Sequence, residues 1–249
     1  MSQQRAFEQL IRKLNQHAAL DAEDEAAIRN LPVSSRLVEP GTYLIAEGDA
    51  PTHCLVLITG FAYRQKQTWT GARQILSVHI PGEAIDFQHL FLKVADHSVQ
   101  VFTRSEVAWT PRELFQNLAL TRPNIGRAIA ICNAIEAAIF REWIVNVGRR
   151  TARERIAHLL CEFASKMAAQ GLSDGNSIEL PITQEQLADA TALTSVHVNR
   201  TLRALETDGF ITRRGRLIQF EGNALWSLAD FDSNYLHFGR QDVGRGAAT

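Results

Sequence analysis

Basic and polar side chains gather in one segment near the C-terminal end of the sequence, at positions 181–220. Five arginines lie between positions 200 and 216, against Glu206 and Asp208, although the whole chain has a formal net charge of −1. A local positive excess of this kind is what binding to nucleic-acid phosphates requires. We therefore expect a DNA-binding surface, with the following candidate contacts: Thr183, Thr194, Ser195, Val196, His197, Asn199, Arg200, Arg203, Arg213 and Arg214.

Two short helices separated by a tight turn would position these side chains. Thr183 and Gln186 have capping-box spacing, which predicts that a helix starts there. Residues 191–193 leave room for a tight turn only, and Thr194 or Ser195 then caps a second helix. This order of elements is that of a helix-turn-helix, in which the second helix contacts the bases.

The second helix has one apolar face and one face suited to DNA bases. Val198, Leu202 and Leu205 fall at helical spacing, which predicts that they are buried. On the opposite face Arg200 can donate two hydrogen bonds to guanine, and the neighbouring asparagine and valine suit adenine and the thymine methyl group. The apolar runs on either side of Gly215 predict two strands and a turn, which would form a basic wing. A small helical domain with ordinary solvated arginines is the alternative.

Short strands are predicted over residues 35–110. Runs such as CLVLI, QILSVHI and VQVFT are apolar and rich in β-branched residues, and glycines separate them at intervals of roughly a strand plus a turn. This pattern predicts an antiparallel barrel or jelly roll. Because helical patterns precede and follow the strands, the predicted fold class is α+β.

A long helix is predicted after the strands. No proline interrupts the sequence from position 124 to 147, and Ile125, Cys132 and Ile139 lie seven residues apart. Such a partial heptad predicts that the helix packs against a second copy of itself. Burial of the helix on its own domain is the alternative.

Three histidines, His79, His89 and His97, lie in the strand-rich segment together with Cys54. Histidine and cysteine are axial haem ligands in some sensors, but surface histidines or hydrogen-bonded core histidines are the favoured interpretation. No histidine–nucleophile pair and no metal-ligand spacing accompanies them. The sequence therefore predicts no catalytic residue, no metal site, no cofactor and no enzymatic activity.

The composition is that expected of a cytoplasmic protein. Hydrophobic residues make up 45% of the chain and charged residues 21%, so a sizeable core can be buried. The three cysteines are odd in number and far apart, which predicts no disulfide framework and fits a reducing compartment. No stretch has the pattern of a signal peptide or of a membrane span, so we expect no membrane partner.

From about residue 30 to residue 220 the sequence resembles the Crp–Fnr family, the relatives of the cyclic-AMP receptor protein. The matching motifs are VEPGTYLIAEGD at 38–49, VLITGFAY at 56–63, IPGEAID at 80–86 and the segment TSVHVNRTLRALETDGFI. The resemblance implies an N-terminal antiparallel β-roll (jelly roll) that senses an effector, a long dimerisation helix and a C-terminal winged helix-turn-helix. We expect these parts at residues 1–110, 111–148 and 149–249, respectively.

The resemblance also implies an effector pocket formed by Gly82, Glu83, His97, Ser98 and Phe140. Members that bind cyclic AMP hold its phosphate with an arginine–serine pair, and the matching pair here is His97-Ser98. A neutral histidine binds phosphate poorly compared with a guanidinium, so no tight binding of cyclic AMP is expected. Members that carry an iron–sulfur cluster use four cysteines, and this chain has three.

The resemblance implies a changed DNA preference as well. The family's usual glutamate on the recognition helix is Val196 here, whereas the arginine that reads guanine is present as Arg200. A cytosine contact is lost with the glutamate, so the operator should differ from the family's best-known site.

The sequence therefore predicts a dimeric, sequence-specific DNA-binding transcription regulator that binds an inverted-repeat operator and is gated by a small, unidentified effector. Its expected partners are double-stranded DNA and a second copy of the chain, with RNA polymerase as a further candidate. One alternative is a cyclic-nucleotide-binding or haem-sensing module whose C-terminal domain mainly contacts protein. Another is a constitutive regulator whose pocket is filled by side chains.

Overall fold

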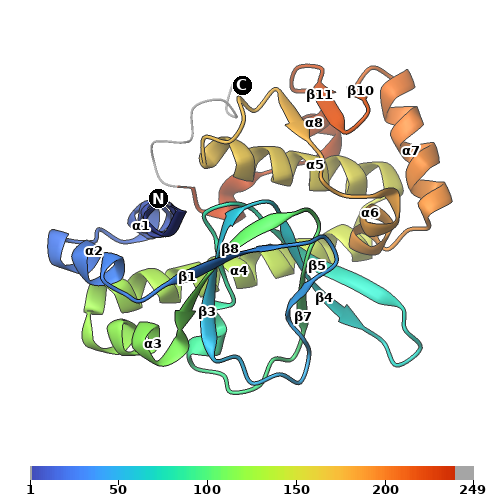
Figure 1. The fold of residues 1–249 in the computed structure, drawn as a ribbon. Coiled ribbons are helices and arrows are strands. Elements are labelled where there is room, and N and C mark those ends of the chain that lie inside the picture. Colours follow the sequence, from blue (N-terminus) through green and yellow to red (C-terminus); the bar gives the residue numbers. More distant parts are fainter. Residues whose placement is uncertain (1, 239–249) are drawn as a thin grey trace. The chain divides into compact units, whose positions relative to one another are not determined.

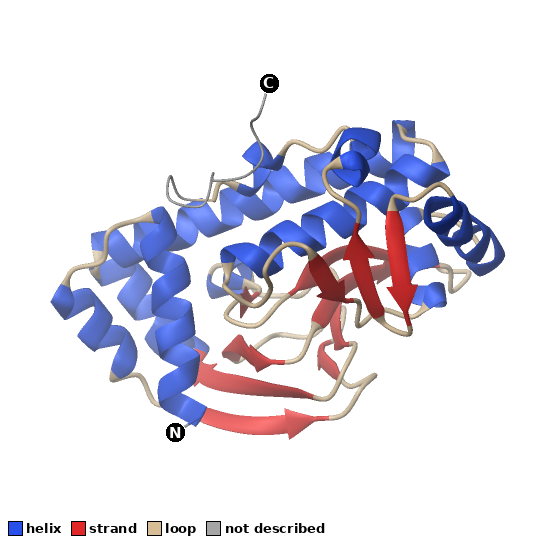
Figure 2. Cartoon of the chain, turned by 90° about the horizontal axis from the view of Figure 1, so that it is seen from above, coloured by secondary structure: helices blue, strands red, loops and turns tan. Residues whose placement is uncertain are grey.

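The computed structural model describes residues 2–238, with side chains from residue 7 onward. Residues 1 and 239–249, the outer ends of the first and third expected domains, lie outside the described residues. The chain divides into two compact units, residues 1–66 with 78–137 and residues 67–77 with 138–249. Helices and strands occur in blocks along the chain, as in an α+β fold (Figures 1 and 2).

The elements of the N-terminal half are mostly strands (Figure 1). They are α1 (Ser2–His17), α2 (Ala22–Arg29), β1 (Ser34–Val38), β2 (Tyr43–Ile45), β3 (His53–Thr59), β4 (Ala62–Gln67), β5 (Arg73–His79), β6 (Ala84–Ile85), the 3-10 helix η1 (Phe87–Leu90), β7 (Ser98–Val101) and β8 (Ser105–Pro111).

From residue 112 onward the elements are mostly helices. They are α3 (Arg112–Thr121), α4 (Pro123–Arg149), α5 (Ala152–Ala169), β9 (Ser177–Glu179), α6 (Gln184–Thr191), α7 (Ser195–Thr207), β10 (Ile211–Arg214), β11 (Leu217–Phe220), α8 (Ala224–Ala229) and the 3-10 helix η2 (Ser233–Leu236).

The strands of the N-terminal half form two four-stranded sheets, in the orders β1-β8-β3-β6 and β2-β7-β4-β5. Antiparallel pairing joins β8 to β1 and β3, β3 to β6, and β7 to β2 and β4, as the glycine-separated runs predict. The predicted jelly roll is thereby confirmed. Gly60, in the turn between β3 and β4, has φ +80, and an added Cβ would lie 2.1 Å from Ser105 Oγ. Only glycine avoids both the strain and the clash at this turn.

Strand β3 is buried on both faces, which explains its uninterrupted apolar sequence. Leu55 and Leu57 belong to the core between the two sheets. Cys54, Val56 and Ile58, which alternate with them, belong to a second core formed with α1, α2, α3, η1 and the first turns of α4. The period of two residues along a strand thus divides one run between two cores.

The helical stretch after Pro111 is two helices rather than one. Arg122 separates α3 from α4 and has extended backbone angles, φ −117 and ψ 103. The ring of Pro123 disfavours helical angles in the residue before it, whereas proline itself suits the first position of the helix that follows. Pro123 therefore ends one helix and begins the next.

The predicted heptad stripe of α4 faces the chain's own core, not solvent. Ile125 and Ile139 are buried, and Cys132 packs against the core that contains Ile125. The alternative interpretation, burial on the chain's own domain, is therefore correct for this stripe. A seven-residue spacing identifies a buried face but does not reveal whether the partner is a second copy or the same chain.

The second unit contains a winged helix-turn-helix. Helices α5, α6 and α7 are accompanied by a three-stranded sheet in the order β10-β11-β9. The wing strands β10 and β11 pair antiparallel, as predicted, whereas β9 was not foreseen because its three residues lie in a polar loop sequence. Beyond the wing, α8 and η2 pack on α5.

A buried carboxylate holds the C-terminal segment onto α5. Trp143 Nε1 donates to Glu162 Oε2 over 2.9 Å, and Tyr235 Oη donates to the same oxygen over 2.6 Å. Burial raises the pKa of Glu162 despite these donors and the charge of Lys166. These contacts make the segment after the wing, through η2, part of this unit.

In the described part of the chain, no helix combines the length and the low polarity needed to cross a membrane.

Candidate DNA interface and buried ion cluster

Capping fixes where the two helices of the helix-turn-helix begin. Thr183 Oγ1 accepts a hydrogen bond from Gln186 N, and Gln186 Oε1 accepts one from Thr183 N, so the predicted capping box is present. Thr194, rather than Ser195, caps α7 and accepts from His197 N over 3.2 Å. The hydroxyls of Thr183 and Thr194 therefore serve as caps.

The apolar face of α7 fixes which side chains point outward. Val198, Leu202 and Leu205 are buried, as their spacing predicts. Arg153 on α5 forms an ion pair with Asp208 at the end of α7, at 2.7 Å. A buried stripe and an anchored end leave one face of the helix directed to solvent.

The exposed face of α7 holds the predicted base-reading residues. Ser195, Arg200 and Arg203 are exposed, and the Val196 side chain is 81% exposed. His197 and Asn199 are half-buried, and Asn199 Nδ2 donates to Gln184 Oε1 of α6 over 3.0 Å. Gln184 was missed in the sequence because its partner lies 15 residues away.

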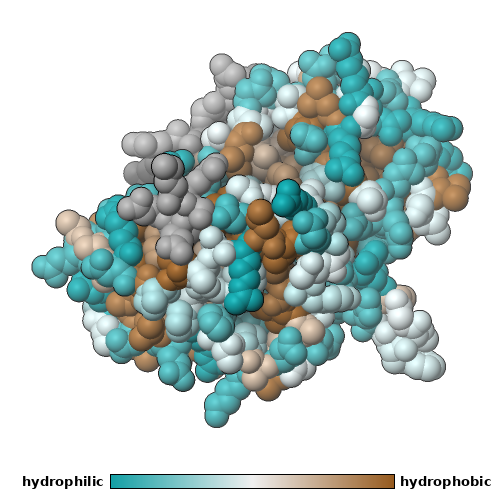
Figure 3. Space-filling model, in the orientation of Figure 1, coloured by the Kyte–Doolittle hydropathy of each residue, from teal (hydrophilic) through white to brown (hydrophobic). Residues whose placement is uncertain are grey.

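The wing contributes arginines of two kinds. Arg214 and Arg216 flank the turn at Gly215 and are exposed. Arg213 is half-buried and donates to Glu206, with Nη2 at 2.9 Å from Oε2. Its charge is partly neutralised within the chain, so Arg213 is a weaker candidate for a phosphate contact than Arg214. The surface over α7 and the wing is mainly hydrophilic (Figure 3).

Arg200, Arg203 and Arg214 form no ion pair within the described residues, unlike Arg213. An exposed guanidinium keeps five donors for phosphates or base edges. Three arginines without an ion pair, on one helix and its adjoining wing, can therefore donate to the phosphates and base edges of a DNA groove.

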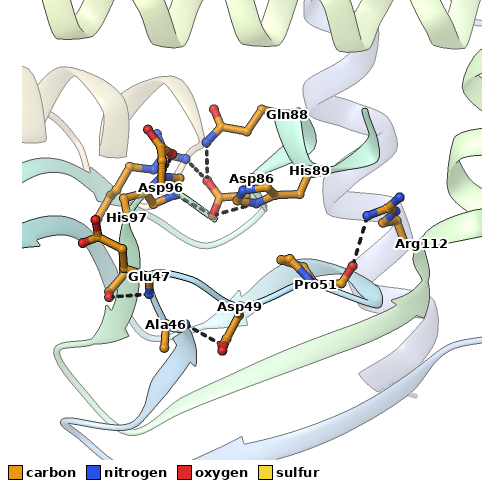
Figure 4. A network of polar contacts seen from close by, with 12 residues as sticks. Ala46, Glu47, Asp49, Pro51, Asp86, Gln88, His89, Asp96, His97 and Arg112 are labelled. Atoms are coloured by element: carbon orange, nitrogen blue, oxygen red, sulfur yellow. Dashed lines mark hydrogen bonds and ion pairs between the residues drawn. The ribbon is translucent and has the colours of Figure 1, made fainter. Parts of the chain in front are cut away.

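A second site lies in the first unit, at the end of β6 (Figure 4). The buried Asp86 carboxylate accepts from His97 Nε2 at 2.9 Å, and His89 Nδ1 lies 3.6 Å from the same oxygen. His97 Nδ1 lies 2.7 Å from Asp96 Oδ1. Both ring nitrogens of His97 are therefore engaged by carboxylates, which leaves neither for an iron ligand in this arrangement.

Arg64 of β4 completes this cluster. Its guanidinium forms ion pairs with Asp86 and with Glu136 of α4, and the residue is 1% exposed. One buried cation thus joins the sheet, the turn after β6 and the long helix. Charges taken out of water are tolerated only when paired, so these three groups depend on one another.

The pKa values in the cluster follow its charges. Burial alone would raise the pKa of Asp86, but the charge of Arg64 and the nearby His89 and His97 hold it well below its usual value. For His97, burial acts to lower the pKa, but the hydrogen bond and charge of Asp86 outweigh burial, so the pKa is raised. The hydrogen bond with Asp96 also raises the pKa of His97, whereas the charge of Arg64 lowers it.

The residues expected to form the effector pocket have different surroundings. Gly82 turns the chain with φ +91, and Glu83 is buried against Lys13 at 2.7 Å. Ser98 Oγ accepts from Glu47 N over 3.0 Å, and His97 lies in the ion cluster. Phe140 belongs to the second unit. These environments place His97, but not Glu83, in direct contact with Asp86.

We expect His97 to stabilise the protein more at low pH than at high pH. A raised pKa means that the folded state binds the proton more tightly, so the stabilisation is complete below about pH 6.5 and is lost as the pH rises through the folded-state pKa. The free energy of unfolding of wild type minus that of H97Q, measured in urea from pH 6 to pH 9, should therefore fall.

Two comparisons keep this measurement specific. Burial lowers the pKa of His158 to about 3, which has the opposite pH dependence but is common to both proteins and cancels in the difference. H53Q, at an exposed histidine of β3, is the matched control. A flat difference for H97Q would mean that the folded cluster does not raise the pKa of His97.

Two family models match separate parts of the chain. The cyclic nucleotide-binding domain matches residues 35–122, and the Crp-like helix-turn-helix domain matches residues 154–225. A β-roll followed by a long helix and a winged helix-turn-helix defines a DNA-binding transcription regulator with a sensor-type domain. Most of α8 and all of η2, which pack on α5, lie beyond the helix-turn-helix match.

Curated relatives and a solved structure agree with these matches. The chain is 28% identical to the transcriptional activator protein FnrL of Cereibacter sphaeroides, over 80% of both chains. It is 27% identical to the nitrogen fixation regulation protein FixK of Rhizobium meliloti, over 71% of this chain and 77% of the relative. The structure of FixK2 from Bradyrhizobium japonicum superposes with a TM-score of 0.73 at 22% identity, over 80% of this chain and 98% of that one. The chain therefore carries a cyclic nucleotide-binding domain and a Crp-like helix-turn-helix domain, is homologous to FnrL and FixK, and is structurally similar to Crp–Fnr regulators.

Proposed function

We propose that this regulator acts as a homodimer that places two copies of α7 in successive major grooves of an inverted-repeat operator. Residues 1–110 would sense an effector, residues 111–148 would dimerise and residues 149–249 would bind DNA. The observation that carries the proposal is the exposed face of α7, where Val196 is exposed and where Arg200 and Arg203 form no ion pair within the described residues. Such a face suits direct recognition of base edges.

The proposed dimer surface is the exposed face of α4, opposite the buried heptad. Ala130, Ala134 and Ala137 recur there at helical spacing and are followed by Ile144 and Val145, all five exposed. Small residues allow two helices to approach closely, and the two branched side chains supply apolar area. This face replaces Ile125, Cys132 and Ile139 as the candidate interface.

Replacing Ile144 with glutamate should convert the dimer into a monomer. Ile144 is 68% exposed, so the substitution leaves the fold of the single chain intact but would bury a charge in the dimer interface. Light scattering coupled to size exclusion, at micromolar protein, measures the mass directly.

L120E is the matched control, because Leu120 is 70% exposed and belongs to α3 rather than to α4. It should leave the mass of the dimer unchanged. A wild type that is monomeric at micromolar concentration, or an I144E protein that remains dimeric, would contradict the proposed interface.

We further propose that a small effector gates DNA binding through the β-roll. The engagement of His97 by Asp86 and Asp96 favours an effector without a phosphate group, since a phosphate would be repelled by both carboxylates. This supports the expectation that cyclic AMP binds weakly, and calorimetry showing a micromolar or lower dissociation constant for cyclic AMP would overturn it.

The alternative of a module that mainly contacts protein is less well supported. Uncommitted arginines on α7 and on the wing are suited to phosphates, and their contacts should depend steeply on salt. Affinity of the whole chain for bulk DNA, followed by fluorescence anisotropy between 50 and 200 mM salt, separates the two, with a decrease of tenfold or more expected for DNA binding. We propose the cytoplasm as the site of action, where chromosomal DNA and the further candidate partner, RNA polymerase, are present.

A further inference from the structure

Asp86 has a backbone conformation that aspartate adopts only at a cost. Its φ is 61° and its ψ is 54°, in the left-handed region that glycine enters freely. The side chain is buried, and its carboxylate lies among Arg64, His89 and His97, which we call the cationic cage. Figure 4 shows Asp86 between His89 and His97.

The cage has the composition of an anion-binding site. Arg64 supplies a buried guanidinium, and His97 supplies a ring nitrogen at 2.9 Å from the carboxylate. Gln88 Nε2 also approaches, at 3.5 Å. All three members of the cage are 3% exposed or less. Without an anion in this position, the buried guanidinium of Arg64 would lose the charged partner that Asp86 supplies, which is costly.

We propose that the cationic cage is an anion-binding site that the chain fills permanently with its own carboxylate, that of Asp86. The site is matched to one small carboxylate held between a guanidinium and an imidazole. Because Arg64 also contacts Glu136, the internal carboxylate keeps α4 joined to the β-roll without an external ligand. This inference depends on the first unit alone and not on the proposed dimer or operator.

Removing the carboxylate should turn the cage into a receptor for an external one. D86G deletes the side chain and places glycine at a position with positive φ. Because glycine adopts positive φ freely, the substitution adds no backbone strain. Sodium formate, compared with sodium chloride at equal ionic strength, should raise the thermal midpoint of D86G in a saturable manner. The expected rise is roughly 3–6 °C at about ten times the dissociation constant of formate.

Two matched proteins control this experiment. Wild type holds its own carboxylate, and D86N fills the same space with a neutral amide, so formate should affect neither beyond a common, non-saturating salt effect. Acetate and inorganic phosphate test the size limit, with weaker effects expected for larger anions.

The outcomes remain decisive if D86G folds poorly. A D86G protein that is unfolded in chloride but refolds in formate, as measured by far-UV circular dichroism, supports the proposal. D86G that shows no specific response to formate, or that stays unfolded in every anion, overturns it. Equal formate effects on D86G and D86N would overturn it too, because the cage would then not be the site of binding.

Discussion

Replacing Arg64 with methionine should destabilise the protein by about 3–5 kcal/mol. The substitution leaves the Asp86 carboxylate buried with only uncharged or partly charged neighbours, and it removes the link between β4 and Glu136 of α4. Removing one partner of a buried ion pair is costly because the charge of the other partner stays buried without compensation. Urea unfolding followed by circular dichroism measures the loss.

The double variant R64M/D86N identifies the cause of this loss. If the cost arises from the uncompensated carboxylate, neutralising it should restore most of the stability, and the two substitutions should not be additive. R104M, at an exposed arginine just before β8, should change stability by less than about 0.5 kcal/mol. Additive losses in the double variant would show that Arg64 contributes through packing rather than through its charge.

Replacing Arg200 with alanine should weaken operator binding by about 1–3 kcal/mol per half-site and relax the preference at one guanine. Arg200 lies on the exposed face of α7, four residues after the exposed Val196 and on the side opposite the buried Val198 and Leu202. Its side chain is therefore placed to reach a base edge when α7 enters the major groove.

R214A is the matched comparison, because Arg214 is an exposed arginine at the wing turn. It should weaken binding to all sequences alike and reduce the salt slope by about one unit per half-site. Fluorescence anisotropy with operator and with scrambled DNA, at several salt concentrations, separates the two effects. Identical behaviour of R200A and R214A would mean that both arginines are phosphate contacts.

The helix-turn-helix could be predicted from the sequence because its signals are local. A capping box at Thr183, a turn too short for any other element and the spacing of Val198 and Leu202 all lie within a few residues of one another. The structure has the two helices and the wing where these signals place them. The β-roll was predictable for the same reason, since glycine turns and apolar runs are also local patterns.

The ion cluster could not be predicted, because its members are distant in sequence. Arg64 lies 22 residues from Asp86 and 72 from Glu136, and only the folded sheets and α4 bring them together. The sequence pattern singled out His97 by its position in a family motif but gave no reason to pair it with Asp86. The dimer contact predicted from the heptad of α4 was wrong for another reason. Ile125 and Ile139 have the right spacing but pack within their own chain.

The most direct test of a base-reading α7 is selection of binding sites from random double-stranded DNA by the wild-type protein. We expect an enriched inverted repeat whose half-sites are centred about one helical turn apart, roughly 34 Å, with a guanine in each half-site that R200A no longer selects. R214A should select the same motif with lower yield. Enrichment of no motif, or of the same guanine by R200A as by wild type, would contradict the assignment of α7 as the recognition helix.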